Sequence, residues 1–149
     1  MEIHAVAAEK KRYLDLLLLA DEQESMIDRY LDRGELFVLT DGGKTRTVAV
    51  VTREGKGVCE LKNLATAPLS QRRGYGAEMI EFLCSQYADS CRVMYVGTGD
   101  SPLTVPFYQF CGFVVSHRIP RFFTDNYDHP IWEAGRQLVD MVYLKRTLN

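Results

Sequence analysis

The sequence has no long hydrophobic run and no excess of charge of either sign. Its longest uninterrupted apolar run, Leu16 to Ala20, is far shorter than the roughly 20 residues that a membrane-spanning helix needs. The N-terminus lacks the basic and then apolar order of a signal peptide. The 18 basic and 20 acidic residues leave a formal charge of −2, so general attraction to nucleic acid or anionic lipid is weak. We therefore expect a cytoplasmic protein that binds neither nucleic acid nor a membrane.

The four cysteines, Cys59, Cys84, Cys91 and Cys111, include no CxxC pair, and we expect reduced and mostly buried thiols. Hydrophobic residues make up 46% and charged residues 26% of the 149, which is an ordinary globular composition. A chain of this length buries a sizeable core without a disulfide or metal staple. No repeat or linker divides it, so residues 1–149 are predicted to form one domain.

Hydrophobic periodicity predicts an α+β fold with a mixed α/β sheet. Strands are expected over 3–6, 36–40, 45–52, 58–67, 92–97, 113–118 and 138–144, and helices within 10–33, over 74–87 and over 105–111. The strongest helical signal is the recurrence of apolar side chains on one face, at Tyr75, Met79, Phe82, Leu83 and Tyr87. The turn at 41–44, Asp-Gly-Gly-Lys, predicts a hairpin between the second and third strands.

Residues 61–77 are the most informative stretch, because a strand leads there through a turn with two arginines and two glycines into the strong helix. The first turn of a helix has backbone N–H groups without intrahelical partners, at the positive end of the helix dipole. Gly74 and Gly76 would let a phosphate approach the backbone without a Cβ in the way, and Arg72 and Arg73 add positive charge. The alternative is an ordinary glycine-bearing loop with two solvated arginines.

Two motifs, one in this stretch and one further along the chain, resemble those of a known family. Gln71-Arg72-Arg73-Gly74-Tyr75-Gly76 after a strand resembles the acetyl-CoA signature of the GNAT N-acetyltransferases. Further along, Phe107-Tyr108-Gln109-Phe110-Cys111-Gly112-Phe113 resembles the second signature, an aromatic pair before glycine-phenylalanine. The resemblance extends from about Val58 to the C-terminus, and the first half matches only in the order of strands and helices. It implies the GNAT acyl-CoA N-acyltransferase fold, a central twisted mixed sheet flanked by helices, and acetyl transfer from acetyl-CoA to a primary amine.

The resemblance also implies roles for individual residues. The pyrophosphate of CoA would be held by main-chain N–H groups of Arg72, Arg73, Gly74, Gly76 and Ala77. Gln71 and Tyr75 belong to the same cofactor-binding signature. The backbone of Leu64 and Thr66 would pair with the pantetheine arm like an added strand, and the Leu64 amide would stabilise the developing oxyanion. Tyr108 would protonate the departing thiolate. On residue type alone, Tyr108 is instead a core aromatic of its short helix.

Glu60 is the family-like candidate for the base that deprotonates the acceptor amine. Period-two alternation places it on the same strand face as Leu64. The separation along the strand then requires a water relay between the carboxylate and the amine. An ordinary exposed strand glutamate explains Glu60 equally well.

Recognition of the acceptor, a small-molecule or peptide amine, is predicted in segment 117–137. This segment mixes aromatic residues with carboxylates: Phe122, Phe123, Tyr127 and Trp132 with Asp125, Asp128 and Glu133. The mixture suits an ammonium group, but it also suits a lid packed on the core or a homodimer contact, and packing is slightly favoured. His117 and His129 lack partners at metal-site spacing, so no metal is expected.

Two other functions stay open from the sequence. A non-catalytic acyl-CoA-binding or sensing module on the same fold would keep Gly74 and Gly76 but would not depend on Tyr108. An interaction domain without a CoA site would explain each feature as ordinary structure. Fold alone does not decide among the three, because one fold hosts many functions.

Overall fold

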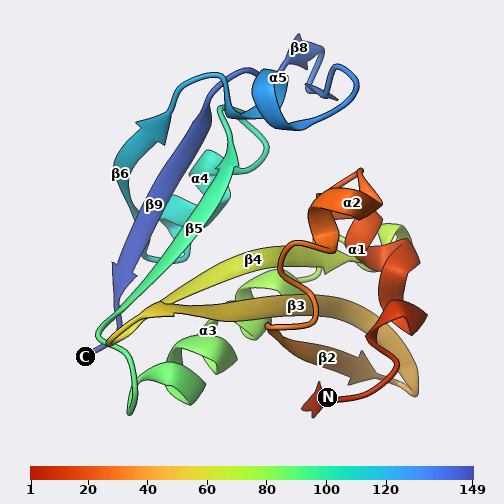
Figure 1. The fold of residues 1–149 in the computed structure, drawn as a ribbon. Coiled ribbons are helices and arrows are strands. Elements are labelled where there is room, and N and C mark those ends of the chain that lie inside the picture. The colour runs from red at the N-terminus through yellow and green to blue at the C-terminus, as the bar shows by residue number, and fades with distance from the viewer.

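The computed structural model describes residues 1–149 and shows a seven-stranded twisted sheet with helices on both faces (Figure 1). Its strands, in the order in which they lie in the sheet, are β1 (Glu2–Val6), β2 (Glu35–Asp41), β3 (Lys44–Gly55), β4 (Val58–Thr66), β5 (Val93–Gly99), β9 (Met141–Thr147) and β6 (Val114–Ile119). The β4–β5 pair is parallel and all other neighbours are antiparallel. The predicted mixed sheet is therefore confirmed.

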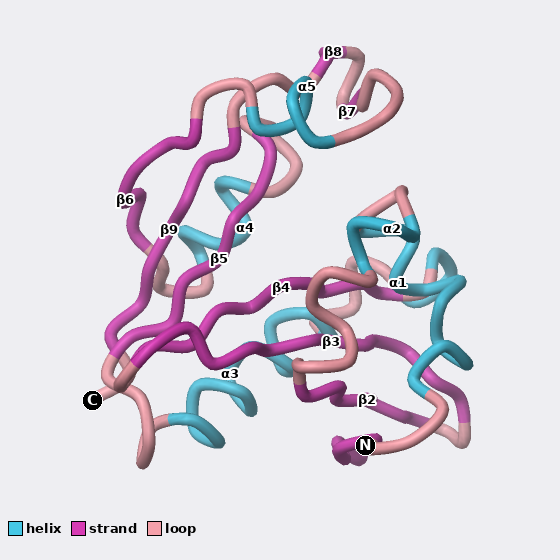
Figure 2. Tube along the Cα trace, in the orientation of Figure 1, coloured by secondary structure: helices cyan, strands magenta, loops and turns pink.

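The helices are α1 (Leu14–Ala20), α2 (Glu24–Ile27), α3 (Tyr75–Tyr87), α4 (Val105–Phe110) and α5 (Phe122–Asn126). A small hairpin of β7 (Trp132–Glu133) and β8 (Arg136–Gln137) stands apart from the main sheet (Figure 2). No helix is long and apolar enough to cross a membrane. All four cysteines are free and buried, as expected from their scatter.

Each face of the sheet carries its own hydrophobic cluster. The larger cluster lies on the face covered by α3 and α4, and the smaller one on the face covered by α1. Alternating side chains of β3 serve both, with Ala49 and Val51 in the larger cluster and Val48 and Val50 in the smaller. A stretch of strand that is buried on both sides is apolar without alternation, as Val48, Ala49, Val50 and Val51 of β3 are.

A β-bulge at Lys62 interrupts the pairing of β4 with β3. Val51 pairs with Leu61 and Val50 with Asn63, so Lys62 has no opposite residue. The bulge reverses the alternation of faces. Leu61 packs in the cluster beneath α3, whereas Asn63, two residues later, donates a hydrogen bond to the α1 backbone on the other face.

β4 and β5 pair over four residues and then separate. Their register runs from Val58–Val93 to Leu61–Val96, and beyond it the two strands diverge like the arms of a V (Figure 1). Residues 62–66 keep partners on β3, apart from the bulge, but have none on the β5 side. This leaves an open backbone edge in the middle of the sheet, where an extended segment can add as a strand.

Two of the expected elements have different bounds. The last helix of the 10–33 region ends at Ile27, and a turn leads from there to β2. The last strand begins at Met141 instead of residue 138, because Leu138 packs with Phe123 and Ile131 in a third, small cluster.

The aromatic residues of segment 117–137 contribute to a small hydrophobic cluster of their own. Phe122 and Tyr127 lie against the small cluster of Phe123, Ile131 and Leu138, which is separate from both clusters of the main sheet. These aromatic residues are packed, but in a cluster of their own and not on the main core as the lid interpretation expected. It is wrong for Trp132, whose surface is 61% exposed.

Candidate active site

The turn before α3 presents six consecutive backbone N–H groups that donate to no protein group. They belong to residues 72–77, and the first backbone hydrogen bond of the helix runs from Glu78 N–H to the Gly74 carbonyl. Arg72 and Gly74 both have left-handed backbones, with φ of 62° and 87°. Unpartnered N–H groups at the positive end of a helix form an anion site. The geometry thus supports a phosphate here rather than an ordinary loop.

The side chain of Tyr75 anchors this turn and is not available to a ligand. It is 7% exposed, and its hydroxyl donates to Asp41 at 2.7 Å. The guanidinium groups of Arg46 and Arg73 lie over its ring, 5.7 and 5.3 Å from the centroid. The hydrogen bond from Tyr75 lowers the pKa of the Asp41 carboxyl. Only the backbone N–H of Tyr75 is therefore left for an anion.

Gly76 and Gln71 have structural explanations of their own. A Cβ on Gly76 would lie 3.2 Å from Cζ of Phe107, so this glycine lets α3 approach α4 closely. The Gln71 side chain donates to the carbonyl of Thr66 at 3.2 Å. Gln71 therefore already occupies one main-chain acceptor of the open β4 edge at Thr66.

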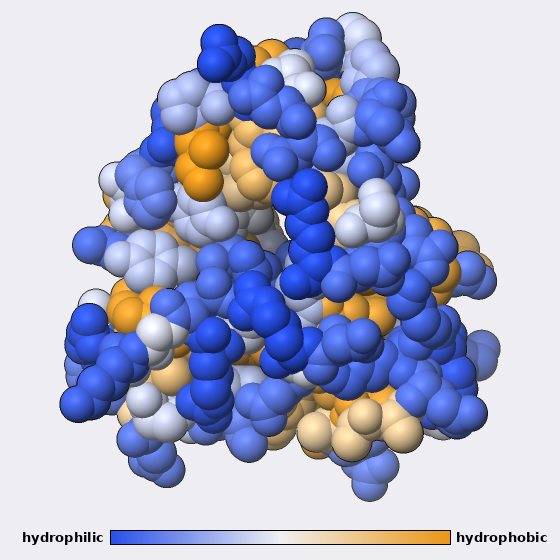
Figure 3. Space-filling model, in the orientation of Figure 1, coloured by the Kyte–Doolittle hydropathy of each residue, from blue (hydrophilic) through white to orange (hydrophobic).

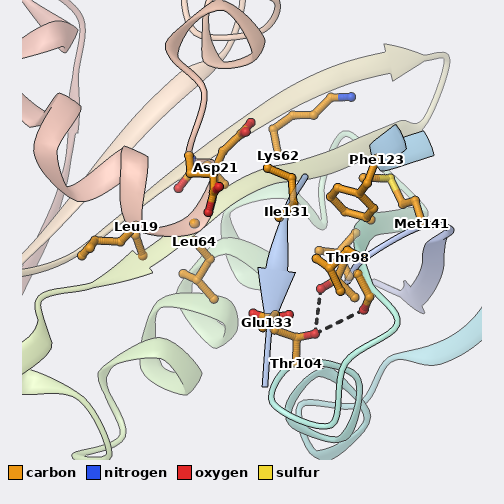
Figure 4. Close-up of a pocket in the computed structure, with 18 of the residues that line it drawn as sticks. Leu19, Asp21, Lys62, Leu64, Thr98, Thr104, Phe123, Ile131, Glu133 and Met141 are labelled. Atoms are coloured by element: carbon orange, nitrogen blue, oxygen red, sulfur yellow. Dashed lines mark hydrogen bonds between the residues drawn. The ribbon is translucent and has the colours of Figure 1, made fainter. Parts of the chain in front are cut away.

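A cavity of about 340 Å³ lies where β4 and β5 separate. Leu64 and Tyr108 line it from the face that carries α3 and α4, and Asp21 and Lys62 line it from the α1 face. In Figure 4 the Lys62 and Leu64 side chains leave β4 in opposite directions. Figure 3 shows the surface hollowed at the centre of the molecule, with hydrophilic side chains around the opening. The gap in the sheet thus connects its two faces.

Tyr108 is both a core aromatic and a cavity residue. Its ring packs edge-on against Phe107 and Phe113, with centroids 5.2 and 5.8 Å away, and it is 8% exposed. Its hydroxyl has no hydrogen-bond partner in the protein, and burial raises its pKa, which keeps the phenol protonated. α4 is held to β5 by a hydrogen bond of 2.8 Å from the Thr98 hydroxyl to Thr104, drawn in Figure 4.

Glu60 lies elsewhere than the alternation predicts. Because the bulge at Lys62 reverses the faces, Leu64 packs on the α3 side, whereas Glu60 lies on the other face beside a second cavity of about 160 Å³. Its carboxylate is buried, forms an ion pair with Lys62 at 3.0 Å and accepts a hydrogen bond from Tyr143 at 2.9 Å. The prediction of a face shared with Leu64 is wrong, and so is the alternative of an exposed glutamate.

Asp21 and Asn63 border the larger cavity and were missed by the sequence analysis. The Asp21 carboxylate accepts hydrogen bonds from Tyr30 at 2.9 Å and Tyr127 at 2.6 Å, and burial raises the pKa of its carboxyl. Asn63 was detectable, because it is a polar residue between Leu61 and Ala65 at alternate positions of a buried strand. Asp21 gave no signal beyond its place directly after the leucine run.

Residues 32–115, more than half of the chain, match the sequence profile described as acetyltransferase (GNAT) domain. The chain belongs to the GNAT family. Among curated proteins it is 35% identical to the uncharacterized N-acetyltransferase YvbK of Bacillus subtilis (strain 168), over 87% of this chain and 85% of that protein. The family resemblance read from the two motifs is confirmed.

Solved structures of GNAT enzymes share the whole fold. A GNAT family acetyltransferase from Elizabethkingia anophelis with acetyl-CoA bound is 32% identical, with a TM-score of 0.93 over 98% of this chain and 97% of that one. An acetyltransferase from Bacillus subtilis in complex with CoA is 30% identical, with a TM-score of 0.92 over 99% of both chains. The GNAT fold implied by the motifs is therefore confirmed, whereas the roles of individual site residues stay predictions.

Proposed function

We propose that this GNAT chain transfers the acetyl group of acetyl-CoA to a primary amine by direct attack, without a covalent enzyme intermediate. One observation carries the proposal: the open edge of β4 at Leu64 and the side chain of Tyr108 border one cavity. Acetyl-CoA as cosubstrate is supported by the similar structures that hold acetyl-CoA and CoA. The acceptor is a small-molecule or peptide amine.

The residues present fit CoA at two places. The six unpartnered N–H groups of residues 72–77 match the acceptor oxygens of a diphosphate, and the exposed arginines Arg72 and Arg73 add positive charge. The unpaired edge of β4 matches the amides of an extended pantetheine arm. At Thr66 the Gln71 side chain shares the carbonyl, so Leu64 offers the less obstructed part of this edge.

Leu64 and Tyr108 then have separate tasks. The Leu64 N–H donates to the oxygen of the thioester carbonyl, where negative charge develops as the amine attacks. Tyr108 gives its hydroxyl proton to the departing thiolate sulfur as the carbon–sulfur bond breaks. The nitrogen that has attacked as a neutral amine gives up one proton, which returns through water to Tyr108. Its hydroxyl has no protein partner that would compete for this proton.

Replacing Tyr108 with phenylalanine tests this assignment. We expect Tyr108→Phe to lower amine-dependent thiol release from acetyl-CoA by about 100-fold or more, because general acid catalysis typically contributes 10²–10⁴-fold. The affinity for CoA, measured by calorimetry, should stay nearly unchanged. Tyr13→Phe is a matched control, since Tyr13 lies near α1 and does not line the cavity. Loss of CoA affinity with unchanged turnover would contradict the role of Tyr108.

Binding of acetyl-CoA distinguishes the two alternative functions, a non-catalytic acyl-CoA-binding or sensing module and an interaction domain without a CoA site. A ligand at 100 times its Kd stabilises a protein by about 2.7 kcal/mol, and at roughly 2–4 °C per kcal/mol this raises the melting temperature by about 5–10 °C. Such a shift without thiol release for any amine would favour a binding or sensing module. No shift at all would favour an interaction domain without a CoA site.

A further inference from the structure

Asp21 is a partly buried carboxylate without a paired cation. Its two oxygens each accept one tyrosine hydroxyl, from Tyr127 and Tyr30, and it forms no ion pair with a lysine, arginine or histidine. The backbone N–H of Gln23 also donates to this carboxylate, and the nearby charge of Arg29 offsets its negative charge only in part. A carboxylate offers about four lone-pair sites, of which three are used here. Asp21 borders both cavities. It is therefore available to a positively charged ligand group.

The side-chain oxygen of Asn63 is a second acceptor near Asp21, and it has no hydrogen-bond donor. Asn63 is 3% exposed, lines the larger cavity, and its Oδ1 is buried with no hydrogen-bond donor. The orientation of its amide is fixed, because the group 3.0 Å from the Leu17 carbonyl has to be the NH₂. The orphaned atom is consequently the oxygen. A buried acceptor left unpaired is costly, and the two hydrogen bonds of its NH₂ group hold the Asn63 side chain against α1 and Tyr30.

Tyr30 holds the two acceptors near each other. Its hydroxyl oxygen accepts a hydrogen bond from Asn63 Nδ2 at 3.1 Å and donates one to Asp21 Oδ2 at 2.9 Å. The cation that lines the same cavity, Lys62, is engaged with Glu60 at 3.0 Å. The Asp21 end of the cavity thus presents hydrogen-bond acceptors and negative charge.

We propose that Asp21, positioned by Tyr30 and Asn63, binds a second, positively charged nitrogen of the acceptor, so that the acceptor is a diamine or a similar dicationic amine. This inference rests on the proposed acetyl transfer. The nitrogen at Asp21 is not the one that reacts, because a nearby carboxylate stabilises the ammonium form, which has no lone pair for attack. The reacting nitrogen belongs beside Leu64 and Tyr108, which border only the larger cavity.

Binding and turnover of matched amines test the inference. The probes are 1,4-diaminobutane, butylamine and 4-aminobutanol, which differ only in the group at the far end. With CoA present, calorimetry should give a Kd for the diamine about 10- to 100-fold lower than for the other two, as expected for a charge-assisted hydrogen bond. The value of kcat/KM for thiol release should follow the same order. Equal affinities for all three amines would overturn the inference without any variant.

The Asp21→Asn substitution removes the charge while keeping the shape. We expect it to abolish the preference for the diamine over 4-aminobutanol in both measurements. Asp128→Asn is the matched control, because Asp128 follows Tyr127 in sequence, is exposed and does not line the cavity. It should keep the preference. Equal loss in both variants would indicate a general effect of charge and would overturn the site.

The two measurements separate this inference from the proposed function. Diamine binding that depends on Asp21, without thiol release for any amine, would refute acetyl transfer and leave the cation site in place. Thiol release that is equal for the three amines and insensitive to Asp21→Asn would support acetyl transfer and refute the cation site. If Asp21→Asn does not fold, the comparison of the three amines on the unaltered protein decides.

Discussion

Glu60 is held by two donors, which gives this single carboxylate a structural role that can be measured. Lys62 and Tyr143 both meet its Oε2, and its side chain is 12% exposed. We expect Glu60→Gln to lower the free energy of unfolding by about 1–3 kcal/mol, because Lys62 loses its charged partner in a partly buried place. Urea denaturation measures this change.

Glu54→Gln is the matched control for Glu60. Glu54 pairs with Arg33 at 2.6 Å, but the arginine is half exposed, so this pair is worth no more than about 1 kcal/mol. A Glu60→Gln variant of unchanged stability, whose kcat loses its dependence on pH, would instead identify Glu60 as the base. That outcome would support the hypothesis that Glu60 deprotonates the acceptor amine, although Glu60 lies on the other face of the sheet from Leu64.

At the scale of the element, the start of α3 depends on a left-handed glycine. Gly74 has φ of +87°, and a Cβ built there meets no atom within 4 Å. Gly74→Ala should therefore cost about 1–2 kcal/mol of stability from backbone strain alone, measured by urea denaturation. It should also weaken CoA binding in calorimetry, because the N–H groups of the turn shift with the backbone.

Gly43→Ala separates these two effects. Gly43 has a similar φ of +74° and equally open surroundings, but it lies in the β2–β3 turn. The two variants should lose similar stability, while only Gly74→Ala loses affinity for CoA. Equal CoA affinity in both would mean that the turn before α3 does not hold the cofactor.

The elements were predictable from the sequence, and the arrangement of the site was only partly so. Periodicity located the strands and α3 because each has an apolar face. The glycine-arginine turn could be identified because its signature consists of consecutive residues. The bulge at Lys62 arises from pairing with β3, which the local pattern does not contain. The face of Glu60 was therefore predicted wrongly, whereas Tyr108, which the second motif singled out, lines the cavity, and its catalytic role stays a prediction.

At the scale of the whole molecule, the two halves of the structure that diverge along β4 and β5 are connected at the closed end of this V and also across its open end. β4–β5 pairing joins them at one end, and hydrogen bonds between residues 21–29 and 126–129 join them at the other. The contacts are Arg29–Asn126, Asp21–Tyr127, Gln23–Asp128 and Glu22–His129. The partners are 97 to 107 residues apart in sequence, so no local pattern predicts them.

His129 makes this connection sensitive to pH. Its ring nitrogens face Asp128 at 2.6 Å and Glu22 at 2.9 Å, and only the protonated ring donates to both. The hydrogen bonds to Asp128 and Glu22 raise the pKa of His129. A group whose pKa is higher in the folded state stabilises the protein fully below its unfolded pKa of about 6.5, and this contribution is lost as the pH rises through the folded value.

We therefore expect the wild-type protein to exceed His129→Gln in free energy of unfolding by more at about pH 6 than at about pH 9. Urea denaturation at the two pH values gives this difference. Glu22→Gln removes one of the two negative charges that face the ring and should reduce the pH dependence of the difference in part. This difference in free energy of unfolding could instead stay constant or grow with pH. Either result would mean that other contacts of residues 126–129, and not His129, connect the two halves across the open end of the V.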